Sequence, residues 1–235
     1  MQTETMLDHL GSLDEILKGK ILLINKPKNW TSFDVVKKIK STIKQKHNIS
    51  KIKIGHAGTL DPLATGLLII CTGKFTKKIA EIQEQKKTYI GELILGKTTP
   101  SYDLETEFDA YFPTQHINKE MLIAASKSFI GKIDQTPPIY SALKVKGERL
   151  YKKARRGEKI KISSRKVEVS SFILTDISLP KIQFKIVCSK GTYIRSIAYD
   201  FGNKVDSGAY LSSLKRTTIG EHMLSNSIEI NDILN

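Results

Sequence analysis

Cysteine is scarce in this chain of 235 residues. Cys71 and Cys188 both lie in apolar runs, where a free thiol usually packs as a small hydrophobic side chain. Neither has a second cysteine nearby or a histidine at zinc-finger spacing. A metal site is therefore not expected, and the cysteine usage fits a reducing cytoplasm.

Long apolar runs and a basic leader are also missing. The first ten residues carry Glu4 and Asp8 and show no basic start followed by an apolar core, which argues against a signal peptide. No apolar run approaches the length needed to cross a membrane. We therefore expect a soluble intracellular protein.

Arginine is scarce as well, although positive charge is in excess. Lys and Arg together number 38 against 24 for Asp and Glu, which leaves a formal net charge of +14 and a pI near 9.6. This balance indicates a polyanionic partner such as nucleic acid. A lysine-biased surface is the alternative, because six of the basic residues are arginine and lysine can merely solvate a surface.

One aspartate stands in an unusual loop between two apolar stretches. Residues 54–66 read IGHAGTLDPLATG, so that three glycines and a proline surround Asp61. Glycine permits dihedral angles that a Cβ forbids, and Pro62 favours an extended backbone at Asp61. The pattern predicts either an Asx-turn, in which Asp61 caps its own loop, or a functional carboxylate, and it favours neither.

Hydrophobic periodicity predicts both strands and helices. Strands are expected at 21–24, 67–71, 86–95, 167–173 and 182–188, the last two as an antiparallel pair. Helices with a capping residue or one apolar face are expected at 31–43, 76–83, 118–129 and 193–204. The lysine face of the helix at 31–43 should be solvated, and the acidic stretch 97–117 should be a surface loop.

The densest positive charge lies in residues 138–161, which we call the basic segment. Its basic side chains are Lys144, Lys146, Arg149, Lys152, Lys153, Arg155, Arg156, Lys159 and Lys161. Tyr140 and Tyr151 interleave them, so neutralisation of an RNA backbone could be combined with stacking on unpaired bases. A solvated exposed helix is the alternative, and the composition leaves the two interpretations level.

Five motifs occur in order along the chain, at 23–27 (LINKP), 55–66 (GHAGTLDPLATG), 87–89 (KTY), 138–144 (PIYSALK) and 188–196 (CSKGTYIRS). Together they resemble the motifs of the TruB family of tRNA pseudouridine synthases, enzymes that isomerise uridine 55 in the T-loop of tRNA. The resemblance runs from about residue 20 to 220. Five ordered motifs are far more specific than a single short pattern.

The resemblance implies a catalytic set. Asp61 would be the nucleophile that attacks either C1′ of the ribose or C6 of the uracil, which frees the base to rotate and re-bond through C5 without a metal or cofactor. Arg195 would pair with Asp61 and keep it ionised. Tyr89 would stack against the flipped uracil and is the candidate general base, with an ordinary strand aromatic as the alternative.

A substrate-binding set follows from the same resemblance. His56 would fill the space that the extruded base leaves, Tyr193 and Leu214 would line the base pocket, and Lys26 and Lys190 would also contact substrate. The glycines of the Asp61 loop would let a nucleotide approach closely. A plain loop histidine at His56 and a core leucine at Leu214 remain the alternatives.

The implied fold is α+β, with a mixed, mostly antiparallel sheet flanked by helices and loops. Residues 1–18 would be an N-terminal extension or short amphipathic helix, and 19–235 a single catalytic domain. The basic segment would be a mobile thumb that grips RNA, with Lys144, Lys146, Arg149, Lys152, Lys153, Arg155 and Arg156 on the backbone. The family's C-terminal PUA domain is not expected, so the catalytic domain would supply the grip.

We therefore expect a cytoplasmic monomer that acts on the T-arm of tRNA, with no cofactor, membrane or obligatory protein partner. A non-catalytic RNA-binding or tRNA-folding module is one alternative, and a pseudouridine synthase with another RNA target is a second. The intact set of Asp61, Tyr89 and Arg195 argues against pure binding, because binding has no use for a carboxylate facing a polyanion. Intact His56 and glycines disfavour another target.

Overall fold

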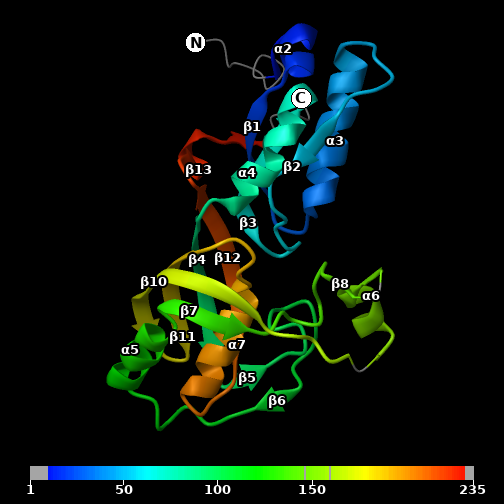
Figure 1. Cartoon of the computed structure of the whole chain (residues 1–235). Helices are drawn as coiled ribbons and strands as arrows, with labels where there is room; N and C mark the ends of the chain where they lie inside the picture. The colour runs from blue at the N-terminus through cyan, green and yellow to red at the C-terminus, as the bar shows by residue number, and fades with distance from the viewer. Residues whose placement is uncertain (1–9, 146, 159, 231–235) are drawn as a thin grey trace. The chain divides into compact units, whose positions relative to one another are not determined.

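A computed structural model describes residues 10–145, 147–158 and 160–230 of the chain (Figure 1). The chain divides into two compact units, which we call the first unit (Met1–Tyr89 with Lys215–Asn235) and the second unit (Ile90–Leu214). Two strands, β4 (Lys87–Leu95) and β12 (Ala209–Ile219), have residues in both. The expected single catalytic domain at 19–235 stays a prediction.

The first unit contains a mixed sheet. Its strand order is β14-β1-β3-β12, with β2 paired to β3 and β13 paired to β12. The strands that lie wholly in this unit are β1 (Ile21–Lys26), β2 (Ile54–His56), β3 (Thr65–Thr72), β13 (His222–Met223) and β14 (Ile228–Glu229). β1 runs antiparallel to β3, whereas β12 runs parallel to β3. The strands expected at 21–24 and 67–71 are confirmed.

The first unit also contains three α-helices and two 3₁₀ helices among its described residues. The first unit holds α2 (Leu13–Lys18), α3 (Ser32–Lys46), the 3₁₀ helix η1 (Gly73–Lys78), α4 (Ile79–Glu84) and the 3₁₀ helix η2 (Leu224–Asn226). The helix expected at 76–83 is therefore a 3₁₀ turn that continues into a short α-helix.

The long helix α3 begins at a capping box and packs on the sheet through one face. Thr31 Oγ1 accepts from Asp34 N, while the Asp34 carboxylate accepts from Thr31 N. Ile39 and Ile43 are fully buried with Ile24, Leu68 and other residues of one hydrophobic cluster. The apolar spacing in the sequence therefore predicted the buried face of α3, and of the two capping candidates, Thr31 and Ser32, Thr31 is the N-cap.

Helix α2 is attached to the end of β3 by one buried hydroxyl. Thr72 Oγ1 donates to Ile16 O at 2.9 Å and accepts from Lys20 N at 3.0 Å. Ile16 is buried in the same cluster as α3. Residues 13–18 thus form the short helix that was one of the two expectations for the N-terminal extension, and residues 1–9 of that extension lie outside the described residues.

The second unit is built on the strand order β12-β4-β11-β10-β7. Its other strands are β5 (Lys97–Thr98), β6 (Ala110–Tyr111), β7 (Gly131–Gln135), β8 (Lys144–Val145), β9 (Glu148–Arg149), β10 (Arg165–Ser178) and β11 (Lys181–Cys188), and its helices are α5 (Lys119–Ser128), α6 (Leu150–Arg155) and α7 (Ile194–Lys204). The expected antiparallel pair is confirmed as β10 and β11, with Phe172 opposite Ile186.

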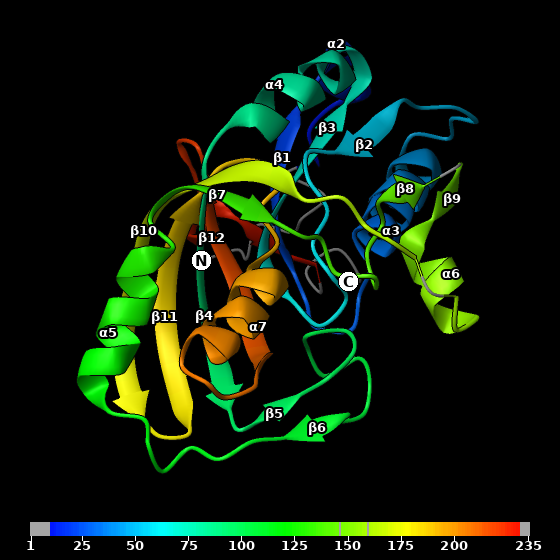
Figure 2. The same ribbon diagram turned by 60° about the horizontal axis from the view of Figure 1, so that its bottom comes forward.

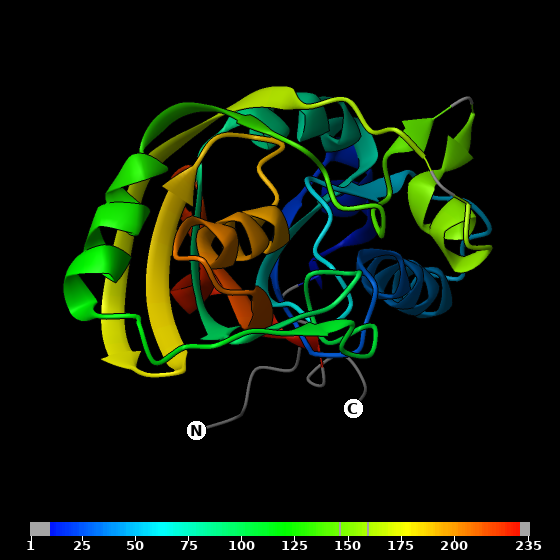
Figure 3. The same ribbon diagram turned by 90° about the horizontal axis from the view of Figure 1, so that it is seen from below.

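Aromatic side chains fill the core of the second unit. The Phe172 ring lies 6.0 Å from Phe129 and from Phe184, and 5.6 Å from Phe201, between ring centroids. These residues come from β10, the C-terminal end of α5, β11 and α7. Figures 2 and 3 show α5 beside β10 and α7 beside β11. The α+β class expected from the sequence is confirmed.

The expectation of a surface loop at 97–117 is wrong for its first part. Thr99, Ser101 and Asp103 are buried. Thr99 Oγ1 and Ser101 Oγ both donate to Asp103 O, at 2.6 and 3.1 Å. Polar composition predicted exposure, but these groups satisfy one another and can therefore lie inside the fold.

Replacing Thr72 with valine keeps the β-branched shape and removes the hydroxyl. We expect the free energy of unfolding to fall by about 1–3 kcal/mol, because Lys20 N loses its acceptor. Urea unfolding followed by circular dichroism measures this loss. Thr72→Ser retains the hydroxyl and should lose less. A larger loss in Thr72→Ser than in Thr72→Val would mean that packing of the methyl group, rather than the hydroxyl, holds α2.

Candidate functional site

The Asp61 loop joins β2 to β3 and is fastened to the start of α3. Ser32 Oγ accepts from Leu60 N at 2.8 Å and donates to Leu60 O at 3.1 Å. On the other side of Asp61, Asn29 N donates to Pro62 O at 2.8 Å. Asp61 itself is half-buried. The carboxylate is thus presented by a loop whose two flanks are held by separate hydrogen bonds.

A buried ammonium group supports this loop from within. Lys26, at the end of β1, is 0% exposed, and its Nζ donates to Pro27 O at 2.8 Å, Trp30 O at 2.7 Å and Pro62 O at 3.3 Å. Burial lowers the pKa of Lys26 to about 8, and the negative charge of Asp61 opposes that shift. Lys26 therefore shapes the loop through backbone carbonyls, and its expected contact with substrate stays a prediction.

A second buried cation, which the sequence reasoning left without a role, is Arg216 of β12. It is 1% exposed; its Nε donates to Leu67 O at 2.8 Å, its Nη2 to Gly58 O at 3.0 Å and its Nη1 to Thr59 O at 3.4 Å. One guanidinium thus ties both ends of the Asp61 loop to β12. The sequence held one signal for this role. Arg216 stands at an apolar position of a strand, in a chain that has few arginines.

The glycines of the loop face the protein's own chain. Gly66 has φ +101°, and a Cβ there would overlap the main chain of Arg216, its partner in the parallel β3–β12 pairing. A Cβ on Gly55 would lie 2.9 Å from Ile79 Cδ1. These two glycines are therefore required by the packing of the protein's own chain, and the expected close approach of a nucleotide stays a prediction.

The remaining first-unit candidates, His56 and Tyr89, lie on β2 and β4. His56 is half-buried, and burial together with the charge of Arg216 lowers its pKa, so the imidazole is neutral at pH 7. Tyr89 is buried. Two residues before it, Lys87 Nζ donates to Gln83 O and Gln85 O at 2.5 Å each and so caps the C-terminal end of α4.

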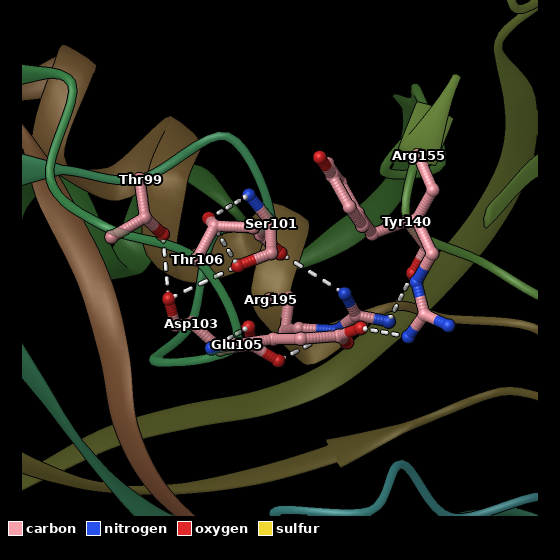
Figure 4. A network of polar contacts seen from close by, with 8 residues as sticks. All are labelled: Thr99, Ser101, Asp103, Glu105, Thr106, Tyr140, Arg155 and Arg195. Atoms are coloured by element: carbon pink, nitrogen blue, oxygen red, sulfur yellow. Dashed lines mark hydrogen bonds and ion pairs between the residues drawn. The ribbon is translucent and has the colours of Figure 1, made fainter. Parts of the chain in front are cut away.

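In the second unit, Arg195 is held by a buried polar network (Figure 4). It is 2% exposed, near the start of α7; its Nη1 donates to Ser101 O at 3.0 Å and its Nη2 to Tyr140 O at 2.9 Å. Asp103 Oδ2 lies 3.6 Å from its Nε. Asp61 belongs to the other unit, and its expected pairing with Arg195 stays a prediction.

Tyr193 is fixed by a glutamine that the sequence reasoning did not single out. Gln135 Oε1 accepts from Tyr193 N at 2.8 Å, and Gln135 Nε2 donates to Tyr193 O at 3.0 Å. The Arg165 guanidinium lies 4.6 Å from the centre of the Tyr193 ring. Lys190 is exposed, and Leu214 is half-buried rather than a core residue. Their contacts with substrate stay predictions.

The basic segment forms the β8–β9 hairpin and α6, and part of its charge is paired internally. Arg156 donates to the Glu148 carboxylate at 2.7 and 2.8 Å and to Glu158 Oε1 at 2.8 and 2.6 Å. Hydrogen bonds from Arg156 lower the pKa of Glu148 to about 2. Lys153 Nζ lies 3.6 and 3.3 Å from the same two carboxylates.

One further ion pair ties α6 to the loop that holds Arg195. Arg155 Nη2 donates to Glu105 Oε1 at 3.0 Å, as Figure 4 shows. Lys144, Arg149 and Lys152 are exposed, and within the described residues none of them has a carboxylate within 4 Å. Lys146 and Lys159 lie outside the described residues.

Among residues 10–145, 147–158 and 160–230, no group of three or more His, Cys, Asp and Glu side chains is placed to hold a metal ion. Over the same ranges, no helix has the length and apolar character needed to cross a membrane. Cys71 and Cys188 are both buried, and burial raises the pKa of Cys71 to about 11.

The family follows from a match over more than half of the chain. Residues 41–194 match the family described as "TruB family pseudouridylate synthase (N terminal domain)". The chain therefore belongs to the TruB family of pseudouridylate synthases, and the resemblance drawn from its five motifs is confirmed.

Two relatives are similar over nearly their whole length. The chain is 57% identical over 218 residues to the tRNA pseudouridine synthase B of Flavobacterium johnsoniae, covering 92% of this chain and 95% of that one. It is 49% identical over 223 residues to the tRNA pseudouridine synthase B of Parabacteroides distasonis, covering 94% and 95%.

Solved structures share the fold. The crystal structure of a Cbf5-Nop10-Gar1 complex has a chain that matches with a TM-score of 0.66 and 26% identity. The match covers 92% of this chain and 53% of that chain, so the present chain spans about half of its length. An archaeal box H/ACA sRNP Nop10-Cbf5 complex matches with a TM-score of 0.65 at 23% identity. The expected pseudouridine synthase fold is confirmed.

Replacing Arg216 with glutamine should disturb the Asp61 loop. We expect the free energy of unfolding to fall by about 3 kcal/mol, because buried carbonyl oxygens lose their donors. Urea unfolding measures the global loss, and amide hydrogen exchange of residues 58–67 measures the local one. Arg149→Gln, at an exposed arginine, should change stability by less than about 0.5 kcal/mol. Unchanged exchange in Arg216→Gln would contradict the bracing role.

Proposed function

We propose that the protein isomerises uridine 55 in the T-loop of tRNA to pseudouridine, with Asp61 as the nucleophile. The observation that carries the proposal is the Asp61 loop, an aspartate in a family signature that two buried cations and a serine hydroxyl hold in shape. Relatives named tRNA pseudouridine synthase B, at 57% and 49% identity, support tRNA as substrate. A monomeric state and a cytoplasmic location are part of the same proposal.

The reaction rearranges bonds within one nucleotide. The Asp61 carboxylate attacks C1′ or C6 of the flipped uridine, and the bond between N1 and C1′ breaks. The uracil turns and a bond forms between C5 and C1′, while the bond from Asp61 to C1′ or C6 breaks. The C5 proton leaves to a base, and N1 takes up a proton. Tyr89, buried on β4, is the proposed base. Atoms and charge balance without an oxidant, reductant or cofactor.

Extrusion of the uridine has to be offset by contacts with the rest of the RNA. Unstacking a nucleotide costs a few kcal/mol. Neutral His56 suits the vacated space in the T-loop, because an uncharged ring can stack among bases. Tyr193, fixed by Gln135, suits the base pocket, since a tyrosine with an ordered backbone loses little entropy on binding.

Arg195 is the proposed partner of Asp61. Its guanidinium is oriented by Ser101 O and Tyr140 O, so the charge is positioned before substrate arrives. Both carbonyls belong to segments that also carry the ion pair between Glu105 and Arg155. The basic segment and the catalytic arginine are therefore mechanically linked within the second unit.

Asp61→Asn should abolish turnover and leave binding near that of the wild type, because the amide keeps the shape of the carboxylate and loses its nucleophilicity. Release of tritium from a tRNA transcript labelled at uracil C5 measures turnover, and filter binding measures affinity. A transcript with cytidine at position 55 is the matched substrate control. Wild-type binding without release would favour a non-catalytic module, and release from the cytidine-55 transcript would point to another target.

Neutralising the unpaired cations of the basic segment should weaken tRNA binding. In a Lys144→Gln, Arg149→Gln, Lys152→Gln variant, the slope of log K against log salt should flatten by about 2, since each phosphate contact contributes about 0.7–0.9. The affinity is measured by filter binding from low to moderate salt.

Two control variants accompany the measurement of the salt slope. Lys119→Gln, Lys127→Gln, Lys132→Gln removes equal charge from exposed positions of α5 and β7 and should leave the slope nearly unchanged. Arg156→Gln, whose guanidinium is engaged by Glu148 and Glu158, should alter the order of α6 more than the slope. Equal slopes for the two triple variants would remove the basic segment from RNA binding.

A further inference from the structure

Helix α3 carries a row of lysines on the face turned away from the core. Lys37, Lys40 and Lys44 follow one another at intervals of three and four residues, which places them on one side of the helix. Lys37 and Lys40 are exposed and Lys44 is half-buried. The buried residues of α3, among them Ile39 and Ile43, are directed into the first unit.

Two adjoining hollows follow this row, and we call them together the α3 groove. One, of about 590 Å³, is lined by Lys37, Lys40, Ser41, Lys44, Gln45, Asn48 and Ile49. The other, of about 430 Å³, is lined by Asn29, Trp30, Asp34, Lys37, Lys38 and Ser41. They share Lys37 and Ser41, so the groove runs from Asn29 to Ile49 within the first unit.

Among the described residues, the lysines of the groove form no ion pair, and the acidic residue in its lining is Asp34, whose pKa is lowered by hydrogen bonds from Thr31 and by the charge of Lys37. In the described part of the chain, no carboxylate lies within 4 Å of Lys37, Lys40 or Lys44. Asp34 is the one acidic residue of α3, and its carboxylate accepts from Thr31 N at 2.9 Å and Thr31 Oγ1 at 2.6 Å. The groove differs in this respect from the basic segment, where Glu148 and Glu158 are already paired.

The groove begins beside the Asp61 loop. Asn29, at one end of it, donates through its N–H to Pro62 O, and Ser32 bonds to Leu60 through its hydroxyl. Figure 1 shows α3 running from this junction along the first unit. With a rise of 1.5 Å per residue, Lys44 lies about 18 Å along the axis from Ser32. A strand bound at Asp61 can therefore continue along the lysines.

We infer that the α3 groove binds the phosphate backbone of the RNA whose target nucleotide lies at Asp61. The inference rests on the proposed function for the identity of that RNA, and on the first unit alone for the site. Lysines offer point charges without base readout, and Ser41, Gln45 and Asn48 add hydrogen-bonding groups between them. The chemistry recognised is a run of phosphates rather than a base sequence.

The test compares two variants of equal charge. Lys37→Gln, Lys40→Gln, Lys44→Gln should weaken tRNA binding about tenfold and flatten the salt slope by about 2. Lys119→Gln, Lys127→Gln, Lys132→Gln, outside the groove, should do neither. Circular dichroism and urea unfolding should match the wild type, because no buried group is changed. A salt slope equal to that of the control variant overturns the inference.

A cross-link provides a readout that is independent of turnover and of affinity. Lys40→Cys can be labelled with a thiol-directed photo-cross-linker, because Cys71 and Cys188 are buried and the Cys71 pKa is raised to about 11. Illumination with bound tRNA should join Lys40→Cys to the RNA, whereas labelled Lys127→Cys should give no adduct. Absence of an adduct at position 40 overturns the inference. An adduct without tritium release from wild type would overturn the proposed function and leave the groove standing.

Discussion

The Asp61 loop depends on two buried cations that donate their hydrogen bonds to backbone carbonyl oxygens. Lys26 reaches Pro62 O from β1, and Arg216 reaches Gly58 O, Thr59 O and Leu67 O from β12. A loop so rich in glycine has little stiffness of its own, because glycine loses the most conformational freedom on folding. The cations supply that stiffness, and the low dielectric around them strengthens each hydrogen bond. The negative charge of Asp61 in turn favours the protonated form of Lys26.

Local rules predicted the regular elements well. The capped start of α3, its apolar face and the alternation in β11 each follow from the local sequence, and both elements were found in the expected ranges. The buried polar segment at Thr99–Asp103 was missed because its burial depends on hydrogen bonds that composition does not encode.

The same limit applies to the site. Asp61 and Arg195 were identified through family motifs, which carry information that spacing alone lacks. Arg216 and Gln135 were missed as site residues because their partners, Gly58 and Tyr193, lie far away in the sequence. The pairing of Arg156 with Glu148 likewise depends on how α6 follows β9, whereas its other partner, Glu158, is two residues away. The residues next to a lysine or arginine in the sequence do not show whether its side chain faces solvent, RNA or a carboxylate.

The bracing of the Asp61 loop by β12 has a consequence for the order in which the protein matures. Arg216 lies 158 positions after Gly58, whose carbonyl it holds. During synthesis the chain emerges from its N-terminus, so the loop, Lys26 and α3 all exist well before their guanidinium brace. A nascent chain can hence form α3, β1, β2 and β3 while the loop still lacks its clamp. The clamp is completed only when β12 pairs in parallel with β3, because that pairing places Arg216 at the loop.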